Sequence, residues 1–100
     1  MDNYTVKVSP EASRNLEQIY RYIAEHFLES GTAKQMIDRL EQGIFSLKRM
    51  PERNPVRRVG IYADRGYRQM LIKNYVIVYR VLPQKREVHI ITVRYAPSQF

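Results

Sequence analysis

The residues of this sequence that could do chemistry are arginines and tyrosines on segments patterned as β-strands. Arg68, Arg94 and Tyr95 are the candidate catalytic residues. Their guanidinium groups could stabilise the charged transition state in which an RNA 2′-hydroxyl attacks the adjacent phosphorus, while the tyrosine moves a proton. Such a protein would be a metal-independent endoribonuclease. The competing interpretation of each arginine is structural, with the charged head in water and the stem on apolar neighbours.

Further basic side chains are candidates for contacting a nucleic acid or another target, namely Arg57, Arg58, Lys73 and Arg80. Side chains alternate between the two faces of a strand, so Arg68, Arg80 and Arg94 could line one surface of a sheet. That surface would be the working face of the protein.

Positive charge is concentrated in the second half of the chain. Residues 1–47 carry five basic and seven acidic side chains, a net charge of −2, whereas residues 48–100 carry twelve basic and three acidic ones, a net charge of +9. The second half should attract a polyanion, which could be RNA, DNA or an acidic protein segment. The alternative is a solvated surface that keeps the protein soluble, because net charge alone identifies no partner.

Most other kinds of site lack their residues. The chain has no cysteine, no glycine-rich phosphate loop and no paired histidines at metal-ligand spacing, so we expect neither a metal nor a cofactor. His26 is expected to cap the first helix and His89 to be a cross-strand neighbour. The sequence has no basic start followed by an apolar run, and no stretch approaches the roughly 20 apolar residues that span a bilayer. A cytoplasmic protein without membrane contact is therefore expected.

A strand and an amphipathic helix are expected at the start of the chain. Apolar and polar residues alternate over residues 4–8, which is the pattern of a strand. Ser9 at the N-cap, Pro10 at the first helical position and Glu11 in the first turn then begin a helix. Apolar residues at spacings of three and four continue this helix to about residues 27–29.

A second amphipathic helix is expected over residues 33–47, with Thr32 as its N-cap and Pro51 as the residue that ends it. The connection between the two helices is short. Two helices joined in this way form an antiparallel hairpin.

The rest of the chain has the pattern of an antiparallel meander. Residues 51–66 are rich in arginine, proline and glycine, and we expect loops there on either side of a short strand near residues 57–61. In the turn Lys73-Asn74, Asn74 is expected to adopt left-handed backbone angles, and residues 83–86 form the next turn. These turns join three strands, which are expected at residues 66–72, 75–81 and 88–95.

Together these elements predict an α+β fold in one domain over residues 1–100. It consists of an N-terminal strand, an antiparallel two-helix hairpin and a three- to four-stranded antiparallel meander, with the helices on one face of an antiparallel sheet. The other face is apolar with scattered arginines, and no further chain is expected to cover it. That face is the candidate binding surface.

The order of elements and several segments resemble the RelE/ParE superfamily of toxins across nearly the whole chain. The segments that carry the resemblance are VSPEA, LEQIYRYI, LKRMP, GYRQM, YVIVYRV and VHIITVRY. The resemblance implies a growth-inhibiting toxin of a bacterial type II toxin–antitoxin pair. It also implies a cognate antitoxin whose extended segment wraps the toxin and masks its basic surface, in a hetero-oligomeric complex.

The superfamily divides by mechanism, and the resemblance favours one branch. RelE-like members cut mRNA on the ribosome, whereas ParE-like members inhibit DNA gyrase. Ribonuclease members often carry an arginine where this chain has Val76, and their tails usually offer a histidine, arginine or tyrosine where this chain has residues 96–100. The ParE-like branch is therefore the first hypothesis. A ribosome-dependent mRNA endoribonuclease using Arg68, Arg94 and Tyr95 is the alternative, and a degenerate, non-toxic domain that only binds the antitoxin is the second.

Overall fold

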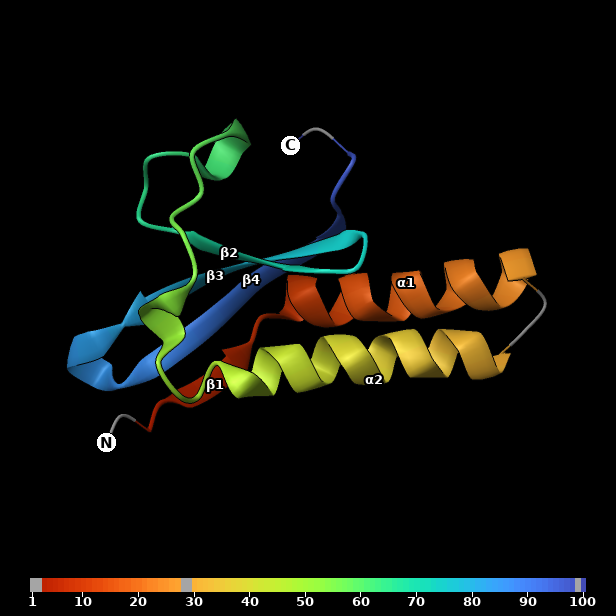
Figure 1. Cartoon of the computed structure of the whole chain (residues 1–100), viewed down its shortest axis with the longest axis horizontal. Helices are drawn as coiled ribbons and strands as arrows, with labels where there is room; N and C mark the ends of the chain where they lie inside the picture. The colour runs from red at the N-terminus through yellow and green to blue at the C-terminus, as the bar shows by residue number, and fades with distance from the viewer. Residues whose placement is uncertain (1–2, 28–29, 99) are drawn as a thin grey trace.

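The computed structural model describes residues 3–27, 30–98 and 100 (Figure 1). A strand and two long helices come first, and three strands follow. They are β1 (Thr5–Val8), α1 (Pro10–Phe27), α2 (Ser30–Ser46), β2 (Arg68–Ile72), β3 (Tyr75–Leu82) and β4 (Glu87–Tyr95). The predicted α+β fold, with its strand, helical hairpin and meander, is confirmed. Short 3₁₀ turns lie at Pro51–Arg53, Gly60–Tyr62 and Pro83–Lys85.

The four strands form one sheet in the order β1-β4-β3-β2. The three meander strands pair antiparallel, as predicted. β1, however, pairs parallel with β4, with Val6 opposite Val88, so the sheet is mixed and not purely antiparallel. Parallel neighbours need a long connection, and the helical hairpin and the meander together supply it.

Three local expectations are corrected. α2 begins at Ser30, so Thr32 lies inside the helix and does not cap it. The strand expected near residues 57–61 is absent from the described chain, where a single bridge between Val56 and Arg68 and a 3₁₀ turn take its place. Lys73, not Asn74, has the positive φ of 53° in the β2–β3 turn. The predicted end of the first helix is confirmed at Phe27, and Glu29 lies outside the described residues.

The N-terminus of α1 is fixed to β4 by polar side chains. Ser9 is the predicted N-cap: its hydroxyl accepts from the Ala12 N–H at 3.0 Å and donates to the carbonyl of Ile91 at 2.9 Å. Ile91 is the extra residue of a bulge, because the β3–β4 register shifts there. One turn further along α1, the Asn15 Oδ1 accepts from the Thr92 hydroxyl at 2.8 Å. The bulge thus gives α1 its attachment to the sheet.

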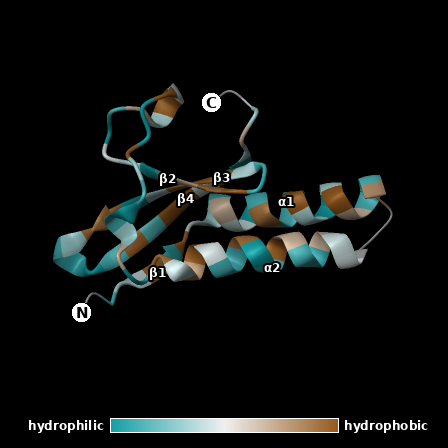
Figure 2. Ribbon diagram, viewed as in Figure 1, coloured by the Kyte–Doolittle hydropathy of each residue, from teal (hydrophilic) through white to brown (hydrophobic). Residues whose placement is uncertain are grey.

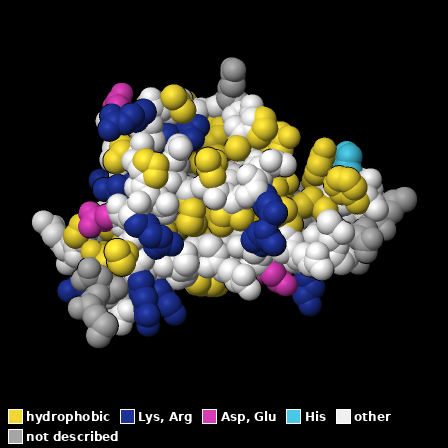
Figure 3. All heavy atoms as spheres, viewed as in Figure 1, with side chains coloured by type: hydrophobic (Ala, Val, Ile, Leu, Met, Phe, Trp, Pro, Cys, Tyr) yellow, Lys and Arg dark blue, Asp and Glu magenta, His cyan; other side chains and the backbone are white. Residues whose placement is uncertain are grey.

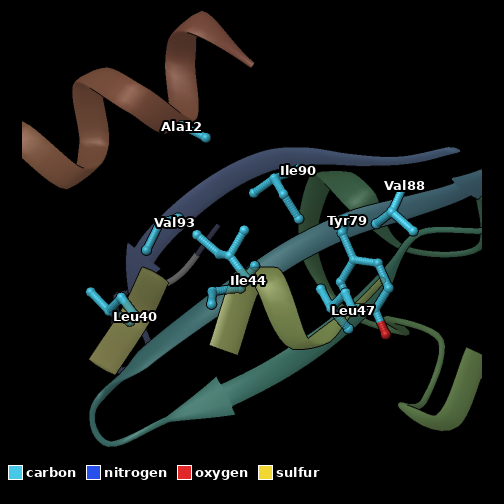
Figure 4. Packing of buried hydrophobic residues seen from close by; sticks show 9 residues of the cluster. Ala12, Leu40, Ile44, Leu47, Tyr79, Val88, Ile90 and Val93 are labelled. Atoms are coloured by element: carbon cyan, nitrogen blue, oxygen red, sulfur yellow. The ribbon is translucent and has the colours of Figure 1, made fainter. Parts of the chain in front are cut away.

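The hydrophobic core lies between the helices and one face of the sheet (Figure 4). Apolar residues recur at helical spacing along α2 and at every second position of the strands, which is why both elements bury one side. Figure 2 shows hydrophobic residues along the strands, while hydrophobic and hydrophilic residues alternate along both helices. The buried cluster comprises Ala12, Leu40, Ile44, Leu47, Ile77, Tyr79, Val88, Ile90 and Val93.

The second face of the sheet is also covered, contrary to the expectation from the sequence. Val76 and Val78 point to this outer face and are at most 2% exposed. The connection between α2 and β2 and the tail after β4 rise on the side away from the helices (Figure 1). The long, proline-containing connection has enough chain to cross the sheet. The candidate binding surface is therefore this loop and tail, not bare strands.

Candidate functional site

The three strand arginines do not line one surface. Arg68 lies opposite Tyr79, so its side chain is on the helix-facing side of the sheet. Arg80 follows Tyr79 in the strand and Arg94 lies opposite Val76, which places both on the outer face. Alternation orders side chains within each strand, but the register between strands decides which residues share a face. That register was not available from the sequence.

The candidate catalytic residues are also far from one another. Arg68, the first residue of β2, lies opposite Tyr79 and donates to the carbonyl of Asn54 at 2.7 Å. Tyr95 packs edge-on against Tyr75, the first residue of β3, with ring centroids 5.9 Å apart. Tyr75 and Tyr79 are four positions apart along β3, which is about 13 Å. A phosphodiester held for cleavage needs its acid, base and cation within hydrogen-bond reach, and this arrangement does not supply that.

Arg57 and Arg94 meet instead on the outer face, around the ring of Phe100. The guanidinium carbons of Arg57 and Arg94 lie 4.2 Å and 4.8 Å from the ring centroid, so both cations stack on one aromatic side chain. The Arg57 Nη1 donates to Gln69 Oε1 at 2.8 Å, and its Nη2 donates to the main-chain oxygen of Phe100 at 3.4 Å. Arg94 is also paired with Glu11 at 3.5 Å.

Arg57 is almost completely buried, with 7% of its surface exposed. Burial lowers the pKa of its guanidinium, and the neighbouring charge of Arg94 lowers it further. Its Nε has no hydrogen-bond partner among the described residues. A buried cation is costly unless it is compensated, and among the described residues the Gln69 side chain and the ring and main-chain oxygen of Phe100 supply that compensation.

Aromatic rings extend this cluster across the outer face. The Tyr62 ring packs edge-on against Phe100 at 6.4 Å and against Tyr67 at 5.2 Å. The guanidinium carbon of Arg80 lies 5.9 Å from the Tyr67 centroid. Arginines and aromatic rings therefore form one continuous chain of contacts, which joins the loop, the tail and β3.

A pocket of about 610 Å³ lies between the loop and the tail, and it is lined by Arg57, Val59, Gly60, Ala96, Pro97, Ser98 and Phe100. Gly60 has φ 76°, and a side chain there would collide with the main-chain oxygen of Phe100. The loop and the tail thus touch backbone to backbone.

The candidate target contacts fall in different places. Arg57 is buried, whereas Arg58 and Arg80 are exposed on the outer side. Lys73 is exposed in the β2–β3 turn, beside Gln35 and Gln42 of α2. Figure 3 shows basic side chains dispersed among apolar ones over this view, without a continuous basic stripe. The sequence did not indicate the parts played by Phe100, Tyr62 and Gln69, because Phe100 is 43 positions from Arg57.

A second polar cluster lies at the far end of the outer face. Glu87 accepts from Lys7 at 2.9 Å and is 2.9 Å from the His89 Nε2. His89 lies opposite Lys7 and Arg80 in the sheet, which confirms it as a cross-strand neighbour. His26, expected as a cap, has its Nδ1 2.9 Å from the Tyr22 carbonyl in the last turn of α1.

The Glu87 cluster gives a prediction for stability against pH. The hydrogen bond from Lys7, and then that from His89, holds the pKa of Glu87 below its usual 4.5. A carboxylate with a depressed pKa stabilises the fold above its unfolded pKa, and this contribution is lost as pH falls through the lower, folded value. Glu87→Gln should therefore show a smaller fall in Tm than the wild type between pH 6 and pH 3.

Glu17→Gln is the matched control, because it removes the same charge from an exposed pair with Arg21. The Tm of both variants and of the wild type would be measured by circular dichroism across this range. Equal falls in Tm for all three proteins would refute the role of Glu87.

The architecture is that of RelE/ParE-type toxins, in which a helical hairpin covers one face of a mixed four-stranded sheet. Residues 6–99 match the family model described as "ParE toxin of type II toxin-antitoxin system, parDE". The chain therefore belongs to the ParE toxin family. No match was found among curated protein sequences. None of the described helices has the length and apolar character needed to cross a membrane.

Solved structures agree with the fold. A chain of the chromosomal ParDE system from P. aeruginosa superimposes with a TM-score of 0.77 at 14% identity, over 95% of this chain and 98% of that one. The toxin–antitoxin complex RelBE2 from Mycobacterium tuberculosis gives a TM-score of 0.69 at 22% identity, over 95% of this chain and 93% of that one. A mutant of the E. coli toxin RelE in the free state gives a TM-score of 0.61 at 18% identity, over 95% of this chain and 85% of that one.

Proposed function

We propose that this ParE-family toxin arrests growth by binding DNA gyrase, and that a cognate antitoxin neutralises it. The family match over residues 6–99 supports the toxin class. The observation that favours gyrase over RNA is the separation of Arg68, Arg94 and Tyr95, which lie on two faces and at different ends of the sheet. The toxin then acts by binding and performs no chemistry of its own.

The outer face has the character of a protein-binding surface. Arg57 and Arg94 are engaged with the Phe100 ring, and Arg94 also with Glu11, so these two arginines are held in place and are not free to follow a nucleic-acid backbone. Arginine and tyrosine are the residues most often found at the energetic centres of protein interfaces. The exposed Arg58 and Arg80 are the positive charges that an acidic partner could reach on this side.

An acidic antitoxin segment fits the charge of this chain. Residues 48–100 carry a net charge of +9, and steering of oppositely charged partners speeds their association. Because the loop and tail cover the outer face, an antitoxin that binds on this side contacts them and not the strands. Two of the similar structures are described as a ParDE system and a RelBE2 complex, which supports a paired antitoxin here.

The test is a supercoiling assay with purified toxin and purified gyrase. We expect gyrase to be inhibited when toxin is in excess, and an equimolar amount of the protein encoded beside the toxin gene to restore activity. Normal supercoiling together with cleaved mRNA in expressing cells would instead place the chain with the ribosome-dependent endoribonucleases. Undisturbed growth on expression without the antitoxin would identify a non-toxic, antitoxin-binding domain.

A further inference from the structure

The loop at residues 58–65 presents two aliphatic side chains to solvent. Val59 and Ile61 are 62% and 60% exposed, on either side of Gly60. Single exposed apolar residues are ordinary on protein surfaces. Here, however, two of them flank one glycine in a segment that projects from the sheet on the side away from the helices (Figure 1). The 58–65 loop therefore carries an apolar tip.

Backbone contacts hold this loop in one conformation. Its base is closed by the Arg57 N–H, which donates to the Tyr67 carbonyl at 2.7 Å, and by the Asp64 N–H, which donates to the Arg57 carbonyl at 3.3 Å. Its centre is held where Gly60 meets the Phe100 main chain and where the Tyr62 ring packs against Phe100. A loop that is already ordered loses little conformational entropy on binding.

The apolar tip is surrounded by positive charge. Residues 53–68 contain five arginines and one aspartate, a net charge of +4. Arg58 is exposed beside Val59, and Arg65 folds back across the loop, with its Nη1 3.4 Å from the Ile61 carbonyl. The complementary surface on a partner is an apolar cleft with an acidic rim.

The side chains at the tip favour a protein partner over a nucleic acid. Single-stranded RNA and DNA are bound by aromatic platforms on which bases stack, and branched aliphatic side chains offer none. The rings that could stack, those of Tyr62, Tyr67 and Phe100, pack against one another and are only partly exposed.

We propose that the 58–65 loop is the element by which the toxin docks into its protein target, with Val59 and Ile61 entering an apolar cleft and Arg58 and Arg65 meeting its acidic rim. The proposal deepens the proposed function and rests on it, since it requires a protein target. The proposal requires that any antitoxin contacts with the loop and tail leave Val59 and Ile61 aside, which the affinity measurement below tests.

The test is the double variant Val59→Ser/Ile61→Ser, with Phe27→Ser/Phe45→Ser as the matched control. Phe27 and Phe45 are about as exposed as the tip residues but lie on α1 and α2. We expect the tip variant to need at least about tenfold more expression to arrest growth, the loss expected when interface anchors are truncated. The control variant should arrest growth like the wild type. The unfolding midpoint of each protein would be measured alongside.

Antitoxin affinity and gyrase inhibition complete the test. The tip variant should bind the antitoxin with unchanged affinity and should inhibit gyrase about tenfold less well. Full growth arrest by the tip variant, or an equal loss in the control variant, would overturn the proposal. So would binding of a single-stranded RNA oligonucleotide that depends on Val59 and Ile61.

The gyrase assay also separates the two proposals. If wild-type toxin leaves gyrase unaffected while growth arrest still depends on the tip, the target is another protein and the docking loop stands. If both variants inhibit gyrase as well as the wild type does, the proposed function stands and the docking loop is wrong.

Discussion

Gly60→Ala is expected to abolish growth arrest and to lower the free energy of unfolding by about 2–3 kcal/mol. Alanine at a φ of 76° adopts a left-handed conformation that disfavours any Cβ. The new Cβ would also collide with the main-chain oxygen of Phe100, which is backbone and has little freedom to move. Either the loop or the tail must shift, so Arg57 and Tyr62 lose their contacts with Phe100.

Gly66→Ala is the control that separates the cost of a left-handed alanine from the cost of the collision with Phe100. Gly66 has φ 81°, but nothing lies within 4 Å of the position its Cβ would take. The Gly66→Ala variant should therefore lose only about 1 kcal/mol of unfolding free energy and should still arrest growth. Urea unfolding, limited proteolysis of the loop and growth arrest on induction would be compared for both variants. If both variants lost the same unfolding free energy and the same growth arrest, the left-handed backbone alone would explain the effect of Gly60→Ala. The contact between loop and tail would then have no further role.

Tyr79→Phe is expected to lower the free energy of unfolding by about 1–3 kcal/mol, although it removes one oxygen atom. Tyr79 is fully buried, and burial raises the pKa of its hydroxyl. That hydroxyl donates to the carbonyl of Pro51 at 2.7 Å and accepts from the Asn54 side chain at 3.1 Å. Phenylalanine leaves both partners without a bond in a site that water does not reach easily.

Tyr20→Phe is the control for Tyr79→Phe, because Tyr20 lies on the exposed side of α1. Its unfolding free energy should change by less than about 0.5 kcal/mol. Urea denaturation followed by circular dichroism would measure both. A loss for Tyr79→Phe no larger than that of the control would show that the hydroxyl does not anchor the segment that leads from α2 into the loop.

The sequence was sufficient for the long helices and the meander, whose determining signals are local, although the start of α2 and the left-handed residue of the β2–β3 turn differed from expectation. Both helices follow from apolar residues at spacings of three and four, and Ser9 was identified as a cap from its position before Pro10. The meander follows from three apolar runs separated by short turns. These signals depend on residues a few positions apart, and tertiary contacts here reinforce them.

The candidate site depended on information that no local pattern holds. Strand register placed Arg68 on the face opposite Arg80, and a one-residue change in pairing would have reversed this. The meeting of Arg57 with Phe100 joins residues 43 positions apart, and Arg57 lies in a connection whose regular structure is limited to short 3₁₀ turns. Cation–π contact can be made by any arginine that lies over an aromatic ring, so residue types alone could not indicate this pair.

The pairing of β1 with β4 has a consequence for how the toxin is made. Thr5 lies opposite Glu87, and Ser9 bonds to Ile91 across 82 positions, so the first strand finds its neighbour only near the end of the chain. Contacts of such high sequence separation form slowly, and β4 is the last strand to leave the ribosome. Nascent chains that stop before β4 cannot close the sheet or bring Phe100 to the loop. The 58–65 loop therefore reaches its final position only once β4 is paired and Phe100 lies against Gly60.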